Sequence, residues 1–86
     1  MTYRIQERNI QGYYLIFMDY DCKKASALAD ALDADPKLDC SGYNGSKKNN
    51  MHTIFVRIDD KELYREDTFT QKMYIDAICK PILSEV

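Results

Sequence analysis

The sequence predicts an α+β fold, a two-layer sandwich in which a four-stranded antiparallel sheet has two helices on one face. Four segments have the residue pattern of strands, two have apolar residues at helical spacing, and they follow one another as ββαββα. The chain has 86 residues, 45% of them hydrophobic and 30% charged, as in soluble globular domains. It contains no internal repeat and no linker rich in proline, glycine or serine. We therefore expect a single domain over residues 1–86.

The N-terminal half predicts a hairpin followed by a helix. Residues 2–9 alternate polar and apolar side chains, as in a strand with one buried face, and residues 13–18 are apolar on both faces, as in a central strand. Asp21 can then cap a helix over residues 22–34, whose apolar residues recur at i, i+3, i+4 and i+7. Pro36 ends that helix, because the residue before a proline disfavours helical backbone angles.

The middle of the chain predicts two further strands joined by a polar tip. Residues 37–43 predict a short strand, and residues 44–50 a hairpin tip whose Ser46-Lys47-Lys48 run fits ordinary solvated charge. Residues 51–59 alternate again, with Phe55 and Arg57 on the face opposite to Ile54, Val56 and Ile58. The charged segment 60–67 fits either a loop or one helical turn, and both alternatives stay open at this stage.

The C-terminal segment predicts the second helix. Thr68 and Gln71 have the T-x-x-Q spacing of a capping box, in which the two side chains satisfy free backbone amides at a helix start. The apolar stripe that we expect to face the core consists of Phe69, Met73, Ala77 and Ile78. The helix should end near Lys80, before Pro81, and leave residues 82–83 as a tail or an extra turn.

These elements predict a permuted ferredoxin-like sheet with strand order 1-2-4-3. In that arrangement both helices cover one face, so the opposite face is left to solvent or to a partner. The first and fourth strands should place six side chains on this open face: Arg4, Gln6, Arg8, Thr53, Phe55 and Arg57. Aromatic residues beside arginines are typical of the centre of a protein interface.

The function that this pattern favours is a small non-enzymatic binding protein, such as an inhibitor, adaptor or regulator. Small single-domain inhibitors, including those encoded by viruses, commonly have this form. Its partner would be another protein or a second copy of the chain, a homodimer. The expected anchors are Arg4, Arg8, Phe55 and Arg57, the arginines for acidic groups and Phe55 for buried area. No cofactor is expected, because none of the three glycines opens a helix as in a phosphate-binding loop.

A nucleic-acid-binding protein is the alternative. The aromatic residues of the two central strands, among Tyr13, Tyr14, Phe17 and Phe55, lie beside Arg57 in a layout that resembles RNA-recognition modules. The segment 53–58 is similar to the end of one signature of that family, although residues 49–52 replace its glycine-aromatic-glycine part. No family resemblance extends over a useful length, and a net charge of −2 is far from that of a dedicated duplex-binding domain.

Three other chemistries find weaker support. Asp19 and Asp21 could hold Mg²⁺ at a strand end, as in a small metal-dependent nuclease, but Asp21 already serves as a helix cap. Cys22 begins a helix and would act as a nucleophile only if His52 lay beside it. The three cysteines and His52 lack the C-x-x-C spacing of a zinc site.

The sequence also predicts a cellular compartment. An odd number of widely spaced cysteines and the lack of a signal-peptide pattern indicate a reducing cytoplasm. No apolar run approaches the length of a membrane span, so no membrane partner is expected.

Overall fold

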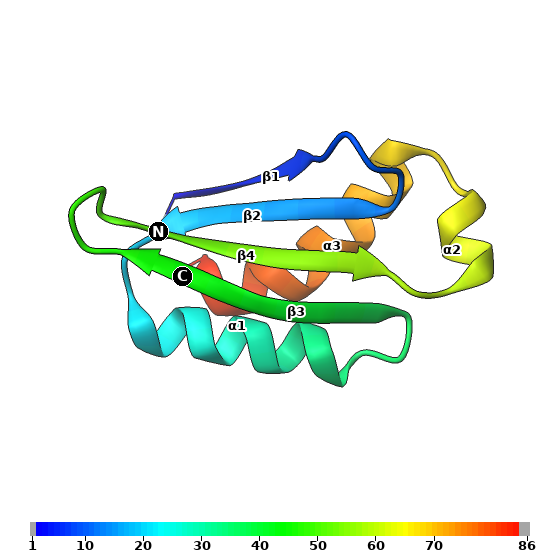
Figure 1. The fold of residues 1–86 in the computed structure, drawn as a ribbon. Helices are drawn as coiled ribbons and strands as arrows, with labels where there is room; N and C mark the ends of the chain where they lie inside the picture. The colour runs from blue at the N-terminus through cyan, green and yellow to red at the C-terminus, as the bar shows by residue number, and fades with distance from the viewer. Residues whose placement is uncertain (1, 85–86) are drawn as a thin grey trace.

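A computed structural model describes residues 2–84 as two layers, with a sheet in front and two long helices behind it (Figure 1). The four strands are β1 (Tyr3–Glu7), β2 (Tyr13–Asp19), β3 (Leu38–Ser46) and β4 (Met51–Ile58). All neighbours are antiparallel, and their order is β1-β2-β4-β3. The predicted α+β class, strand order and ferredoxin-like arrangement are therefore confirmed.

The first helix, α1 (Cys22–Ala34), has the predicted bounds. The carboxylate of Asp21 accepts a hydrogen bond from the backbone N–H of Lys24 at 3.1 Å, which is the predicted cap. Asp35, just before Pro36, leaves the helical region with a ψ of 124° and ends the helix as expected. The bounds of α1 could be predicted from the sequence because each end is set by residues next to it in the chain.

The hairpin between β3 and β4 is tighter than the sequence suggests. The third strand continues through residues 44–46, so the tip is reduced to residues 47–50. Asn50 has a φ of 53°, in the left-handed region that asparagine tolerates better than most residues. The polar composition of residues 44–46 concealed a strand whose hydrogen bonds with β4 come from backbone groups.

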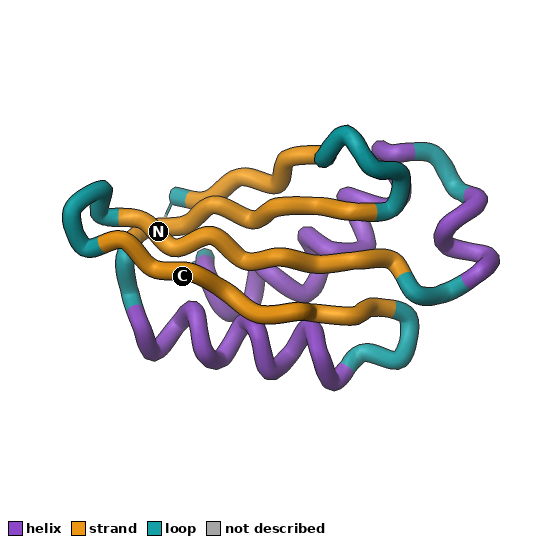
Figure 2. The backbone as a smooth tube through the Cα atoms, viewed as in Figure 1, coloured by secondary structure: helices purple, strands orange, loops and turns teal. Residues whose placement is uncertain are grey.

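The segment left open between loop and helix is a short helix, α2 (Lys61–Arg65), which lies beyond one end of the sheet (Figure 2). The last helix, α3 (Thr68–Leu83), does not end before Pro81 but runs through it. A proline in the last turn removes only one helical hydrogen bond, and burial of Leu83, which is 0% exposed, offsets that loss. Of the two alternatives for residues 82–83, the extra helical turn is the one observed, as the end of α3.

The capping-box prediction for α3 is wrong. Asp67, rather than Thr68, caps the helix by accepting the N–H of Thr70 at 2.7 Å. Gln71 is 3% exposed and lies in the interior, where its amide oxygen accepts the hydroxyl of Tyr14. Its amide nitrogen donates to carbonyls at the end of α2, including that of Leu63 at 3.0 Å. Gln71 therefore satisfies the free carbonyls of one helix from the first turns of the next.

The predicted core stripe of α3 is wrong for Phe69, Met73 and Ala77, which are exposed, whereas Ile78 packs against the core as expected. The helix buries Gln71, Ile75, Cys79 and Leu83, spaced by four residues. Phe69 and Met73 point away from the core and are 70% and 57% exposed. The helix carries apolar residues on two sides, and the sequence does not say which of them meets the sheet.

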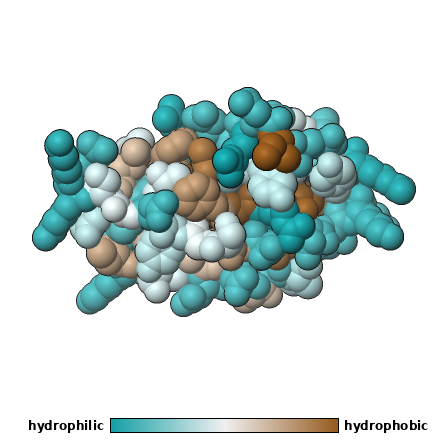
Figure 3. Space-filling view, in the orientation of Figure 1, coloured by the Kyte–Doolittle hydropathy of each residue, from teal (hydrophilic) through white to brown (hydrophobic). Residues whose placement is uncertain are grey.

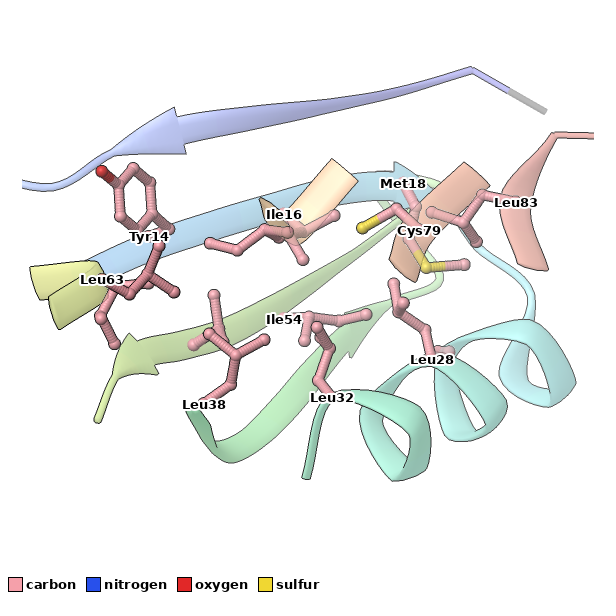
Figure 4. Packing of buried hydrophobic residues seen from close by; sticks show 14 residues of the cluster. Tyr14, Ile16, Met18, Leu28, Leu32, Leu38, Ile54, Leu63, Cys79 and Leu83 are labelled. Atoms are coloured by element: carbon pink, nitrogen blue, oxygen red, sulfur yellow. The ribbon is translucent and has the colours of Figure 1, made fainter. Parts of the chain in front are cut away.

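The core lies between the sheet and the two long helices (Figure 4). Alternate residues of β2 and β4 point into it, among them Ile16 and Ile54, both 0% exposed. Leu28 and Leu32 of α1 meet them from the opposite side. This packing fixes which face of each strand is turned away from the helices.

Candidate functional site

The open face of the sheet carries the side chains that the sequence assigned to it. The register aligns Arg4 with Phe17 and Phe17 with Thr53, and in the same way Gln6 with Leu15 and Leu15 with Phe55. Residues paired in this way point to the same side of a sheet. Because α1 and α3 lie behind the sheet, these side chains face the viewer in Figure 1, and Figure 3 shows apolar brown groups among hydrophilic ones across this face.

Three of the four predicted anchors meet at one hollow of about 170 Å³, which is lined by Arg8, Tyr13, Asp39, Ser41, Phe55, Val56 and Arg57. The guanidinium of Arg57 binds the carboxylate of Asp39 at 2.6 Å and that of Asp59 at 3.3 Å. The hydrogen bond to Asp39 raises the pKa of Arg57 above its ordinary value. Arg57 is thus held in place within the chain and forms a wall of the hollow.

Arg8 differs from Arg57 in its surroundings. It is exposed, directly after β1, and no carboxylate of residues 2–84 forms an ion pair with it. The hollow therefore has one arginine already neutralised and one available for an acidic group. In the sheet, Tyr13 lies between these two arginines, because it pairs with Arg57 and its carbonyl accepts the N–H of Arg8. Phe55 lines the same hollow and is partly exposed.

Arg4 lies at the other end of the open face. Its guanidinium stacks over the ring of Phe17, with 4.6 Å between the guanidinium carbon and the ring centroid. Both residues line a second hollow, of about 240 Å³, together with Thr2, Tyr3, Met18, Asp19, Asn49, Asn50 and Met51. The four predicted anchors lie on one face of the sheet, but they belong to two separate hollows, with Arg4 apart from the other three.

The candidate metal ligands do not form a cluster in the described part of the chain. Asp19 is exposed at the end of β2, while the carboxylate of Asp21 is engaged with the first turn of α1. Within residues 2–84, no three side chains of His, Cys, Asp or Glu come together as metal ligands. Over the same residues, no helix has the length and apolar character required to cross a bilayer.

His52 is buried, at 2% exposure, because it lies in phase with Ile54, Val56 and Ile58 along β4. Its ring stacks on Tyr20 with 4.5 Å between centroids, and Tyr43 meets it edge-on. Neither ring nitrogen has a hydrogen-bond partner among the described residues, so no Cys22–His52 pair exists there. The alternation of residues 51–59 could have predicted this burial, because it places His52 on the same face as the buried apolar residues.

The three cysteines lie in separate environments. Cys22 is exposed, Cys40 is half-buried in β3, and Cys79 is buried in α3. Burial raises the pKa of Cys79 to about 12, which keeps this thiol protonated and makes it a packing residue. Burial also raises the pKa of the Cys40 thiol.

Sequence reasoning missed one surface, because its apolar residues were assigned to the core. Phe69 and Met73 of α3 border a groove beside β1, of about 380 Å³, whose other lining residues are Tyr3, Arg4, Ile5, Lys72 and Asp76. The hydroxyl of Tyr3 donates to Asp76 at 2.5 Å and ties β1 to α3 across the floor of this groove. We call the four residues Phe69, Lys72, Met73 and Asp76 the outer stripe of α3.

Fold and site thus define a small α+β protein with an uncovered sheet face bearing arginines and aromatic rings. Comparisons with protein-family models, with curated proteins and with solved structures found no match for this chain.

Proposed function

We propose that the chain is a non-enzymatic binding module, an inhibitor, adaptor or regulator, that holds another protein on the open face of its sheet. The observation that supports this most is the hollow shared by Arg8, Phe55 and Arg57. An aromatic ring that lines the same hollow as two arginines supplies buried area together with directional hydrogen bonds, which is the composition of interface hot spots.

The anchors have different roles in this proposal. Phe55 supplies the apolar contact at the centre. Arg8 binds a carboxylate of the partner, since it has no such group of its own within residues 2–84. Arg57 is already paired with Asp39 and so gives the hollow a fixed wall. Arg4 makes a second, more distant contact with its guanidinium held over Phe17.

The proposal is tested by affinity capture with quantitative mass spectrometry from cells that naturally contain the protein. We expect a specific protein to be retained by the unaltered chain and reduced at least about tenfold by Phe55→Asp and by Arg8→Glu. The matched control is Phe69→Lys, an equally drastic change of an exposed aromatic residue on the helix side of the molecule. A set of captured proteins that is the same for all four chains contradicts the proposal.

Single-stranded nucleic acid is the second candidate ligand, favoured by the ring of Phe17 stacked against Arg4 and by Phe55 on the same face. Fluorescence anisotropy with labelled RNA and DNA oligonucleotides at low salt measures this directly. Binding that falls steeply with added salt and is lost in Phe55→Asp would replace the protein-binding proposal. Cleavage of those oligonucleotides that needs Mg²⁺ and disappears in Asp19→Ala would establish a nuclease instead.

A further inference from the structure

The outer edge of β1 has backbone groups that pair with no other strand of the part of the chain described by the structure. The N–H of Arg8 binds the carbonyl of Tyr13 in β2 at 3.0 Å. Since hydrogen-bonding residues alternate along an antiparallel pair, Gln6 and Arg4 also direct their backbone groups to β2. The N–H and C=O groups of the intervening residues Tyr3, Ile5 and Glu7 therefore point outward. No strand within residues 2–84 pairs with this side of β1.

Beside this edge lies the outer stripe of α3. Phe69 and Met73 are the two most exposed large apolar side chains of the described residues, at 70% and 57%. They line one groove together with Ile5, whose side chain is only partly covered by the core. An unpaired strand edge next to exposed apolar side chains is the surface on which another strand can add to a sheet.

We propose that a second copy of this chain occupies this surface, by antiparallel pairing of β1 with β1 across a twofold axis at Ile5. The two sheets then continue as one, and the outer stripes of the two α3 helices approach each other behind it. Such an interface is closed and uses the same patch on both copies. It uses the edge of the sheet, so it stands independently of the function proposed for the open face.

The residues along β1 fit a second copy in this register without opposing like charges. With the axis at Ile5, Arg4 lies opposite Gln6 of the second copy, and Tyr3 opposite Glu7. All three outward residues then pair, with about six backbone hydrogen bonds between the copies. Sliding one strand by two residues either way places Arg4 opposite Arg4 or opposite Arg8 of the second copy, and like charges directly opposite are destabilising.

The first experiment measures mass by sedimentation equilibrium from about 1 µM to about 1 mM chain, in a Cys22→Ser background that removes the exposed thiol. We expect a reversible dimer. The double variant Phe69→Lys/Met73→Lys should raise the dissociation constant at least about tenfold. Ile10→Lys is the matched control, because Ile10 is 56% exposed but lies outside the groove, and it should leave the dimer intact.

A second variant tests the backbone pairing itself. Glu7→Pro removes an N–H that points outward, so it should abolish the dimer while the circular dichroism spectrum and the urea midpoint stay close to those of the parent. Ile5→Cys tests the register, because residues opposite each other in a hydrogen-bonded pair lie about 5.5 Å apart, within the range of a disulfide. Gln6→Cys should not form that disulfide, since Arg4 of the second copy lies opposite it.

Several outcomes overturn the proposal. A monomer at every concentration does so, and so does a dimer that survives Phe69→Lys/Met73→Lys but is split by Phe55→Asp, which would place the interface on the open face. A monomer whose β1 edge is protected only by an extended peptide of another protein also overturns it. Failure of the open-face proposal is distinguishable, because its variant Phe55→Asp leaves this dimer unchanged.

Discussion

The two edges of the sheet are built differently. β1 is a regular five-residue strand whose outward backbone groups pair with no strand of residues 2–84, and the outer stripe of α3 lies beside it. β3 has nine residues and a bulge between Cys40 and Gly42, where the register with β4 shifts. Gly42 takes a φ of 135° at this point. Helix α1 packs behind β3, while β1 is joined to α3 by the hydrogen bond from Tyr3 to Asp76 and packs on the core through Ile5.

This difference indicates that only one edge is suited to pairing. A bulge interrupts the regular spacing of hydrogen-bonding groups and twists the strand, which is one of the ways proteins prevent association through an edge. β1 has charged residues but neither a bulge nor a proline. With one blocked and one regular edge, association through strand edges would stop at two copies and would not continue into a fibre.

The largest expected effect concerns how firmly each edge is fixed to the core. Leu32 of α1 is 0% exposed behind β3, so Leu32→Ala should lower the free energy of unfolding by about 3 kcal/mol through lost burial and a cavity. Ile5 of β1 is only partly buried, so Ile5→Ala should cost about 1 kcal/mol. Urea denaturation at low chain concentration measures both. Equal losses would remove the distinction between a firmly packed and a lightly packed edge.

The next effect concerns the bulge of β3. A Cβ on Gly42 would meet no atom within 4 Å, yet the φ of 135° is a conformation that other residues rarely adopt. Gly42→Ala should therefore lower the free energy of unfolding by about 1 to 2 kcal/mol through backbone strain alone. Ser41→Ala, one residue away and exposed, is the control and should change it little. A Gly42→Ala chain as stable as the parent would mean that the bulge does not depend on glycine.

The smallest effect concerns two tyrosine hydroxyls, one near each edge. Tyr3 donates to Asp76 beneath β1, and Tyr74 donates to Asp35 just before β3, at 2.8 Å. Burial, followed by the hydrogen bond to the carboxylate, raises the pKa of each from 10.0 to about 12. Replacing either by phenylalanine should lower the free energy of unfolding by about 1 kcal/mol at neutral pH.

The pH dependence of that effect has a definite sign. A tyrosine whose pKa is higher in the folded than in the unfolded chain stabilises fully below pH 10 and loses this contribution as pH rises toward 12. The urea midpoint should therefore decrease less between pH 9 and pH 11 in the double variant Tyr3→Phe/Tyr74→Phe than in the parent chain. An equal decrease of the urea midpoint in both chains would show that these hydroxyls do not cause the loss of stability at alkaline pH.

Much of the fold could be predicted from local pattern. The alternation of β1 and β4 placed Arg4, Phe55 and Arg57 on the open face, and Asp21 with Pro36 bounded α1. The errors fall in α3, where Phe69 and Met73 were expected in the core and Gln71 at a cap. Both errors concern residues whose environment depends on elements distant in the sequence.

The sequence by itself determined which residues alternate across each strand, where α1 begins and ends, and the order in which the elements follow. A two-residue period and the preferences of caps and prolines act within a few residues, so they can be read without knowing the neighbours. Only the tertiary structure decided which side of α3 meets the sheet, what Gln71 binds, and that no strand of the described residues pairs with the outer edge of β1. Those outcomes depend on packing volume and hydrogen-bond partners that distant segments bring together.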